Sequence, residues 1–390
     1  MRWLVNARPV TLRDRPALVA GAAGAVAAAG LATLFGGHLG GLAWFLHLGR
    51  ESPATVHAAR QLFGPRVVVP HAIGHDGRMS WALARDPLLV HGRADRLLLD
   101  RPAYRAQRIA YPLLAAPWRV FGERALLWGL LATNVAVIAV GTAATARLSQ
   151  LLGAPARAAV AFALCPTVVV ALLGDLGDAL GVAGVVIAIG MVLERRWWQA
   201  TAALVITCLA RESSLLVVAA MVIATPRPTP WRARAMLGAL PLIAVIAWGA
   251  YARWRLGWPP TSLAEFSVPG SGYLEAWRLE WSHLHNWGDA GAAAALWPLG
   301  ALLALRCRRR PTVLRAAALA PALLVPFFSV QVVDVALNSL RALGASITLL
   351  GVDLYASASA RPRAPEGTAE RPELDQCGPL FPGPPRRLTS

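Results

Sequence analysis

One carboxylate of this chain stands in a setting suited to acid–base chemistry. Asp76 lies in the segment Gly74-His75-Asp76-Gly77, inside a long polar stretch that follows the first apolar run. A carboxylate held beside a hydroxyl group removes its proton as a general base when that oxygen attacks another atom. The same residues also fit a simpler interpretation, in which Asp76 caps the following helix and Gly77 forms the turn. The sequence around Asp76 leaves both interpretations open.

A group of arginine and tyrosine residues follows in the same polar stretch, after Asp86. In a helix, one face would carry the polar residues Tyr104, Arg108 and Tyr111, with Arg105 beside them. The other face would be apolar and would carry Ile109, Leu113 and Leu114. Such a helix lies along a membrane surface, where its guanidinium groups bind the phosphate oxygens of an anionic lipid headgroup. Pro112 either kinks this helix or begins a second one.

Other ionisable residues interrupt or border apolar runs: Asp175, Asp178, Arg211, Glu212 and Arg341. In a membrane such residues are costly and usually face a cavity or one another. Arg211 and Glu212 either neutralise each other in a turn, or Arg211 reaches a lipid phosphate. Arg341 either extends toward the membrane surface or meets a phosphate there. The two aspartates are turn and cap residues, or they line the mouth of a site.

The composition places these residues in a membrane protein. The chain has 390 residues, of which 56% are hydrophobic and 15% charged, and its mean hydropathy is +0.49. Soluble domains carry about 25% charged residues. The formal net charge is +17, and every basic residue is arginine. Arginines at helix ends account for this charge, so it does not indicate nucleic-acid binding.

The sequence gives no sign of a metal centre or a disulfide framework. The four cysteines are scattered without CxxC or CxxH spacing, and His283 and His285 have no third ligand near them in sequence. We therefore assign no metal ligands and no certain cofactor, and the need for a divalent metal stays open.

Apolar runs of membrane-span length recur along the chain, at 17–35, 125–146, 158–174, 176–193, 235–252, 290–305, 316–333 and 334–354. The stretch 197–225 is too long for one span and is divided by Arg211-Glu212. A hairpin of two short helices there puts every short arginine-rich connection on one side, which the positive-inside rule identifies as cytoplasmic. The prediction is an all-α bundle of about ten membrane segments with both termini cytoplasmic.

This topology divides the chain into three parts, the second of which contains two large loops. Residues 1–16 form a cytoplasmic N-terminus, and residues 17–354 form the transmembrane domain. Residues 37–124 and 253–289 form two extracytoplasmic loops within it, and the first of these contains the membrane-parallel helices. Residues 355–390 are rich in Pro, Arg and Glu and are predicted to be a disordered cytoplasmic tail. The composition is typical of a GC-rich bacterium, so the expected location is the plasma membrane.

Four short motifs follow one another along the chain: GHDG at 74–77, RDP at 85–87, YRAQRIAYP at 104–112 and LARES at 209–213. This set resembles bacterial integral-membrane proteins of the GT-C glycosyltransferase superfamily, over roughly residues 17–350. The resemblance implies a polyprenyl-phosphate-linked sugar donor and a catalytic carboxylate in the first extracytoplasmic loop, which Asp76 matches. In many relatives a second acidic residue stands beside this carboxylate, whereas this chain has His75.

The leading hypothesis is therefore transfer of a sugar to an extracytoplasmic acceptor in the cell envelope, with membrane lipid as a partner. Asp76 is the catalytic candidate. The substrate-binding candidates are His75, Asp86, Tyr104, Arg105, Arg108, Tyr111, Asp178, Arg211, Glu212 and Arg341. Two alternatives stay open: a transporter or flippase of a lipid-linked or polar substrate, and a catalytically inactive scaffold related to GT-C enzymes. The sequence does not name the sugar, the acceptor, the stereochemical outcome or the oligomeric state.

Overall fold

A computed structural model describes residues 15–39, 41–67, 69, 74, 76–90, 99, 101–226, 228–257, 266–282, 298–299, 301–302, 305–306, 312–333 and 336–359. This part of the chain is all-helical, which confirms the predicted fold class. Phe266 and Phe328 form an isolated antiparallel bridge.

Among the described residues, three helices are long and apolar enough to cross a membrane. They are α1 (Arg15–Leu39), through its segment Arg15–Gly36, α8 (Glu123–Leu151) and α14 (Trp231–Leu256). A fourth candidate is a pair bent by 53°, in which η3 (Ala156–Ala159) and α9 (Val160–Ala163) precede α10 (Pro166–Leu173). The bend falls at Pro166, because proline lacks an N–H group and disfavours helical backbone in the residue before it. By length and composition, these segments support a membrane protein.

The other predicted spans are shorter or interrupted. α11 (Asp178–Leu193) matches the run 176–193, but the runs 316–333 and 334–354 each contain a break. They form α17 (Thr312–Ala322), η7 (Val325–Phe327), α18 (Val330–Val333), α19 (Ala336–Ala342) and α20 (Gly344–Ser359). Pro321 and Pro326 lie at the first break, where continuous helical hydrogen bonding is lost. Most of the predicted span 290–305 lies outside the described residues.

The stretch 197–225 forms the predicted hairpin. α12 (Trp197–Ala210) and α13 (Leu215–Ala224) are separated by η4 (Glu212–Ser214). Arg211 contacts Asp178 at the start of α11, while Thr225 accepts a hydrogen bond from Arg234 in the first turns of α14. The far end of α14 reaches the helices of the first loop through a hydrogen bond from Trp248. Hence the chain reverses at Arg211.

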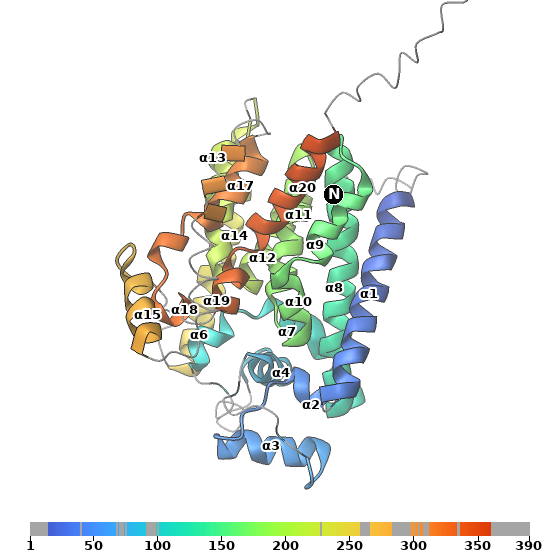
Figure 1. Cartoon of the computed structure of the whole chain (residues 1–390), viewed down its shortest axis with the longest axis vertical. Helices are drawn as coiled ribbons and strands as arrows, with labels where there is room; N and C mark the ends of the chain where they lie inside the picture. Colours follow the sequence, from blue (N-terminus) through green and yellow to red (C-terminus); the bar gives the residue numbers. More distant parts are fainter. Residues whose placement is uncertain are drawn as a thin grey trace, which may run out of the picture.

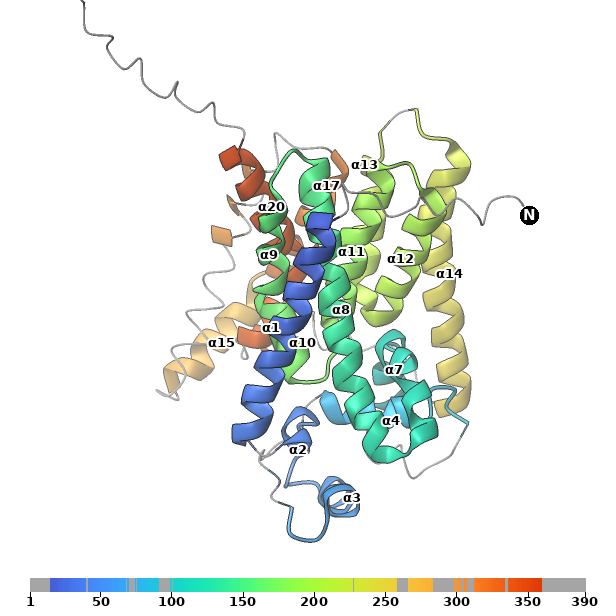
Figure 2. The ribbon, with the colours of Figure 1, turned by 90° about the vertical axis from the view of Figure 1, so that its right-hand side faces the viewer.

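The first loop folds into short helices at one end of the bundle: α2 (Leu42–Phe45), α3 (Pro53–Phe63), α4 (Gly77–Arg85), α6 (Pro102–Ala106), α7 (Ala110–Ala115) and η2 (Ala116–Phe121). Figures 1 and 2 show α2, α3 and α4 at the lower end of the bundle. The start of α1 and the end of α20 lie at the opposite, upper end. α20 continues through Ser359, so residues 355–359 belong to a helix rather than to the tail, and the remainder of the tail lies outside the described residues.

The predicted amphipathic helix of this loop is divided in two. α6 ends at Ala106 and α7 begins at Ala110, so the second helix opens two residues before Pro112. Leu113 and Leu114 are 48% and 49% exposed, as expected of an apolar outer face, but Ile109 is buried. Exposed apolar side chains continue into η2, with Trp118, Val120 and Phe121. This surface suits a segment lying at a bilayer boundary.

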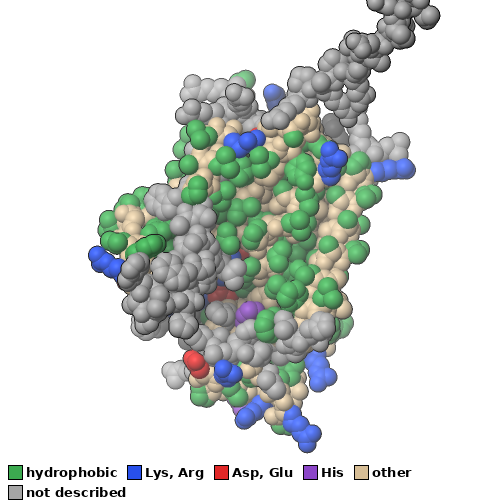
Figure 3. All heavy atoms as spheres, viewed as in Figure 1, with side chains coloured by type: hydrophobic (Ala, Val, Ile, Leu, Met, Phe, Trp, Pro, Cys, Tyr) green, Lys and Arg blue, Asp and Glu red, His purple; other side chains and the backbone are tan. Residues whose placement is uncertain are grey.

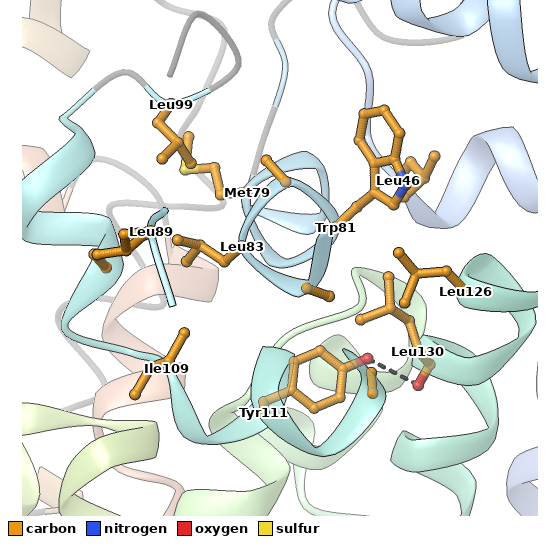
Figure 4. Close-up of a cluster of buried hydrophobic side chains, with 14 of the residues drawn as sticks. Leu46, Met79, Trp81, Leu83, Leu89, Leu99, Ile109, Tyr111, Leu126 and Leu130 are labelled. Atoms are coloured by element: carbon orange, nitrogen blue, oxygen red, sulfur yellow. Dashed lines mark hydrogen bonds between the residues drawn. The ribbon is translucent and has the colours of Figure 1, made fainter. Parts of the chain in front are cut away.

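α4 is held in place by the apolar core beneath the bundle. Trp81 and Leu83 of α4 are buried; in Figure 4 Trp81 lies beside Leu46 of the loop, and Leu83 points to the other side of α4, toward Leu89. Tyr111 of α7 and Leu130 of α8 lie below α4 in the same view. Because α4 is surrounded by buried side chains from several helices, its first residue has a fixed position. Asp76 immediately precedes that residue.

The surface divides in the way a membrane protein requires. Hydrophobic side chains cover most of the bundle face seen in Figure 3, whereas the basic side chains visible there gather mainly at its two ends. Large apolar residues of α14, including Ile243 and Ile246, are more than half exposed. Exposing such an apolar surface to water is unfavourable, whereas contact with lipid costs little free energy.

Gly77 allows α4 to approach its neighbours, and a side chain there is predicted to destabilise the fold. A Cβ atom at Gly77 would lie 2.5 Å from the carbonyl oxygen of Phe45 and 2.7 Å from that of Gly174, and backbone atoms cannot move aside easily. Gly77→Ala is expected to lower the free energy of unfolding by about 1–3 kcal/mol. Thermal unfolding of the detergent-solubilised protein measures this. Gly190→Ala is the control, because no neighbouring atom lies within 4 Å of its Cβ; equal melting temperatures for both variants would contradict the prediction.

Candidate functional site

The Asp76 side chain does not cap the helix that follows it. It makes no hydrogen bond to the free N–H groups of α4. Instead, Oδ1 accepts a hydrogen bond from Nη1 of Arg105 at 2.8 Å, and Oδ2 accepts one from Nη2 of Arg341 at 2.8 Å. The helix-cap interpretation is therefore wrong, and the carboxylate lies between two guanidinium groups.

Arg341 joins the first loop to the helical bundle. Its Nη2 lies 2.8 Å from Oδ2 of both Asp76 and Asp178, and its Nε donates to the same Asp178 oxygen at 2.8 Å. The Arg341 side chain is 13% exposed. It does not extend toward an open surface, because its charged end is held by two carboxylates, which lie 265 and 163 positions before it in the sequence.

Arg211 and Glu212 do not neutralise each other. Arg211 forms an ion pair with Asp178, and its Nε donates to the hydroxyl group of Ser213. Glu212 binds Arg108 through two hydrogen bonds, of 2.8 and 3.1 Å. The hairpin tip thus contacts both the α10–α11 turn and the first loop. Because Asp178 binds two arginines and caps no helix end with its side chain, the cap interpretation is wrong for this residue as well.

The two tyrosines of the predicted polar face have different surroundings. The Tyr104 hydroxyl accepts a hydrogen bond from Arg108, and the guanidinium groups of Arg105 and Arg108 lie 5.5 and 5.0 Å from its ring centre. The Tyr111 hydroxyl is buried and donates to the carbonyl oxygen of Leu130 at 2.9 Å. Tyr104 therefore supports the two arginines, whereas Tyr111 attaches α7 to α8.

We call the following residues the arginine–carboxylate cluster: Asp76, Arg105, Arg108, Asp178, Arg211, Glu212 and Arg341. They come from the first loop, the α10–α11 turn, the hairpin tip and the end of α19. The cluster contains four guanidinium groups and three carboxylates. It therefore carries one excess positive charge, which favours an anionic ligand.

The cluster keeps Asp76 ionised. Burial by itself raises the pKa of Asp76, but three guanidinium groups, that of Arg341 foremost, outweigh burial and hold the pKa well below its usual range. Since the pKa is lower in the folded than in the unfolded protein, ionised Asp76 stabilises the fold at neutral pH. This contribution is lost as the pH falls below the unfolded value of about 4 toward the folded value.

Two small cavities meet at the cluster. The first is lined by Asp76, Ser80, Arg105, Arg108, Asp178 and Arg341 among others. The second is lined by Arg211, Ser213 and the apolar side chains of Val182, Val185, Val217 and Leu324. Asp178 and Arg341 line both cavities. The site therefore has a mixed polar and apolar side toward the first loop and a more apolar side toward the bundle.

Asp86, another of the candidate residues, does not join the cluster. Asp86 lies at the other end of α4 from Asp76, where its Oδ1 accepts a hydrogen bond from the N–H group of Val90 at 2.9 Å. His75 lies outside the described residues, as do His283 and His285. In the part of the chain that is described, no three His, Cys, Asp or Glu side chains lie close enough to hold a metal ion.

The sequence interpretation missed Asn134 and Ser213. Asn134 is fully buried in α8, and its Nδ2 donates to the Tyr111 hydroxyl at 2.9 Å and to the carbonyl oxygen of Ala171 at 3.0 Å. It holds α7 and α10 together beside the cluster. A lone asparagine in an apolar run was the available signal, because buried amides in membrane helices are usually hydrogen-bonded.

Searches against protein-family models, curated proteins and solved structures return no match for this sequence.

Proposed function

We propose that the protein transfers a sugar from a polyprenyl-phosphate donor to a hydroxyl group of an acceptor outside the cytoplasmic membrane. The observation that carries this proposal is the position of Asp76. Its carboxylate extends from a loop at one end of an apolar helical bundle and is joined through Arg341 to a cluster with excess positive charge. The resemblance to GT-C glycosyltransferases supports the same assignment.

In this proposal Asp76 takes the proton from the acceptor hydroxyl group. The acceptor oxygen then attacks the anomeric carbon, and the bond between that carbon and the phosphate oxygen breaks. The polyprenyl phosphate leaves with the electron pair, so its negative charge rises from one to two. Arginine stabilises this developing charge because the guanidinium group pairs with two phosphate oxygens at once. Arg341, Arg211 and Arg108 supply such groups around the junction of the two cavities.

The proposed topology has about ten membrane segments, both termini in the cytoplasm and the cluster at the outer face. The two-sided nature of the site supports it, since a more apolar side toward the bundle suits an isoprenoid chain and a mixed polar and apolar side toward the loop suits a sugar. A transporter or flippase would use the same charged residues to gate a path, and an inactive scaffold would bind the lipid without turnover.

Thiol labelling of intact cells is expected to separate the two ends of the bundle. Arg60→Cys in α3 and Arg232→Cys in α14 replace exposed residues at opposite ends. In a chain whose four natural cysteines are replaced by Ala, a membrane-impermeant reagent should label position 60 from outside. Position 232 should react only after the membrane is permeabilised. The reverse pattern would contradict the proposed orientation.

Lipid analysis of a deletion strain tests the proposed function. Loss of a sugar transferase should leave its donor unused, so a polyprenyl-phosphate-linked sugar is expected to accumulate. One sugar should be missing from the cell-envelope glycans of the same strain. Re-expression of the wild-type protein should reverse both changes. Unchanged lipid and glycan profiles would contradict the proposal, and the accumulated lipid would identify the donor sugar.

A further inference from the structure

We propose that the donor phosphate takes the Arg341 guanidinium away from Asp76, so that the carboxylate becomes available to an acceptor only after the donor is bound. This inference rests on the proposed function and assigns Arg341 as the residue that couples the two substrates. The donor would then have to bind before the acceptor, because both need a group of the same Arg341–Asp76 ion pair.

The first step is that Arg341 has no free pair of donors for a phosphate. A guanidinium group has five N–H donors, and a bidentate phosphate needs two of them on one edge. Nε and Nη2 of Arg341 bind the two aspartates, and Nη1 lies 3.4 Å from Oδ1 of Asn338. A phosphate can therefore bind Arg341 in this way only by displacing an existing partner.

The second step identifies the partner that is displaced. Arg341 makes one hydrogen bond to each aspartate, from Nε to Asp178 and from Nη2 to Asp76, but its Nη2 also forms an ion pair with Asp178 at 2.8 Å. The side chain of Asp178 is 6% exposed, whereas that of Asp76 is 21% exposed. The bond to Asp76 is thus the weaker connection, and its loss leaves a carboxylate that water or an acceptor can reach.

The third step concerns space. The free volumes of the two cavities are about 40 and 30 Å³. Both cavities are small while the ion pairs are closed. Arg341 and Asp178 form the wall that both cavities share. Movement of Arg341 therefore joins the cavities at the point where phosphate and sugar would meet.

The consequence for Asp76 follows from the charges around it. Arg341, Arg105 and Arg108 are the cations that lower its pKa. When Arg341 turns to a phosphate, Asp76 loses its strongest cationic neighbour and gains an anionic one. Both changes make the carboxylate a stronger base. Without donor, the ion pair keeps Asp76 from acting on water or acceptor.

The test measures binding of a polyprenyl phosphate to the purified full-length protein in detergent, without any transfer reaction. If Arg341 must leave Asp76, then Asp76→Asn removes the competing carboxylate and should tighten binding by about tenfold. Glu212→Gln is the matched control. It also removes one negative charge from the cluster, but the carboxylate it removes is paired with Arg108 and not with Arg341. Its gain in affinity should be markedly smaller.

Two double variants assign the effect to Arg341. The gain should disappear in Asp76→Asn/Arg341→Gln and persist in Asp76→Asn/Arg105→Gln. Equal gains in Asp76→Asn and Glu212→Gln, or a gain that survives loss of Arg341, would overturn the inference. If Asp76→Asn does not fold, Asp76→Ala is measured in its place. The variants could show the expected changes in affinity while the wild-type protein consumes no lipid-linked sugar. That result would refute the proposed function but still support the exchange of the Arg341 ion pair.

Discussion

Asp76→Asn is expected to abolish sugar transfer while the protein stays folded and inserted in the membrane. The amide keeps the shape of the side chain but cannot accept a proton, and a general base contributes about 10²–10⁴-fold to rate. Arg341 keeps its bonds to Asp178 in the variant, and Arg105 lies at the partly exposed edge of the cluster. The fold should therefore tolerate the change. Re-expression of the variant in a deletion strain, followed by lipid and glycan analysis, measures the effect.

Glu123→Gln is the control for this experiment. Glu123 also pairs with an arginine, Arg85, but its side chain is 37% exposed and lies outside both cavities. Exposed pairs contribute little, so this variant should restore the glycans as the wild type does. An Asp76→Asn protein that restores them equally well would rule out the general-base role.

Arg341→Ala is expected to be the most destabilising single change in the cluster. It leaves Asp76 and Asp178 facing each other across the site without the cation that they share. Removal of one partner from a buried ion pair costs up to about 3–5 kcal/mol, and here Asp76 keeps its pair with Arg105 and Asp178 keeps its pair with Arg211. The variant should also lose affinity for polyprenyl phosphate. Thermal unfolding in detergent and lipid binding measure the two effects.

Arg147→Ala provides the comparison for Arg341. Arg147 binds Glu194 at 2.7 Å, but its side chain is 40% exposed. Its loss should cost about 1 kcal/mol or less and leave lipid binding unchanged. Adding Asp178→Asn to Arg341→Ala should recover part of the lost stability, since it removes one of the two carboxylates that lose their shared cation. Equal melting temperatures for the Arg341 and Arg147 variants would contradict the arrangement described for the cluster.

The cluster was largely predictable because charged residues are rare and costly in apolar segments. Arg211, Glu212 and Arg341 were each identifiable from their apolar neighbours, and Asp178 from its place in a short turn between two spans. The hairpin at Arg211 followed from the distribution of arginines along the chain. These features depend on local composition, which a sequence shows directly.

The pairings could not be predicted, because they depend on how distant segments pack. Nothing in the sequence indicates that Glu212 binds Arg108 rather than Arg211, or that Arg341 reaches a carboxylate in the first loop. The helix breaks at Gln107–Ile109 and within 316–354 depend on local packing and on prolines, whose effect varies with context. Asp86 was predicted to bind substrate because it is charged, but its carboxylate accepts a hydrogen bond from a nearby backbone N–H group.

The functional assignment rests on geometry together with a resemblance carried by short motifs. Three of the four motifs contribute directly to the cluster, through Asp76 of GHDG, Arg105 and Arg108 of YRAQRIAYP, and Arg211 and Glu212 of LARES. Because these motifs lie far apart in the sequence but meet in one ion-pair network, together they support a shared functional site more strongly than any single motif does.

The most direct test uses the purified protein in liposomes with the lipid fraction of a deletion strain and an extract containing the acceptor. The account predicts that the wild-type protein converts the accumulated lipid-linked sugar to free polyprenyl phosphate, and that the Asp76→Asn variant does not. Mass spectrometry of the extracted lipids detects both species. Movement of the intact lipid-linked sugar between leaflets without cleavage, or equal cleavage by the variant, would contradict the account.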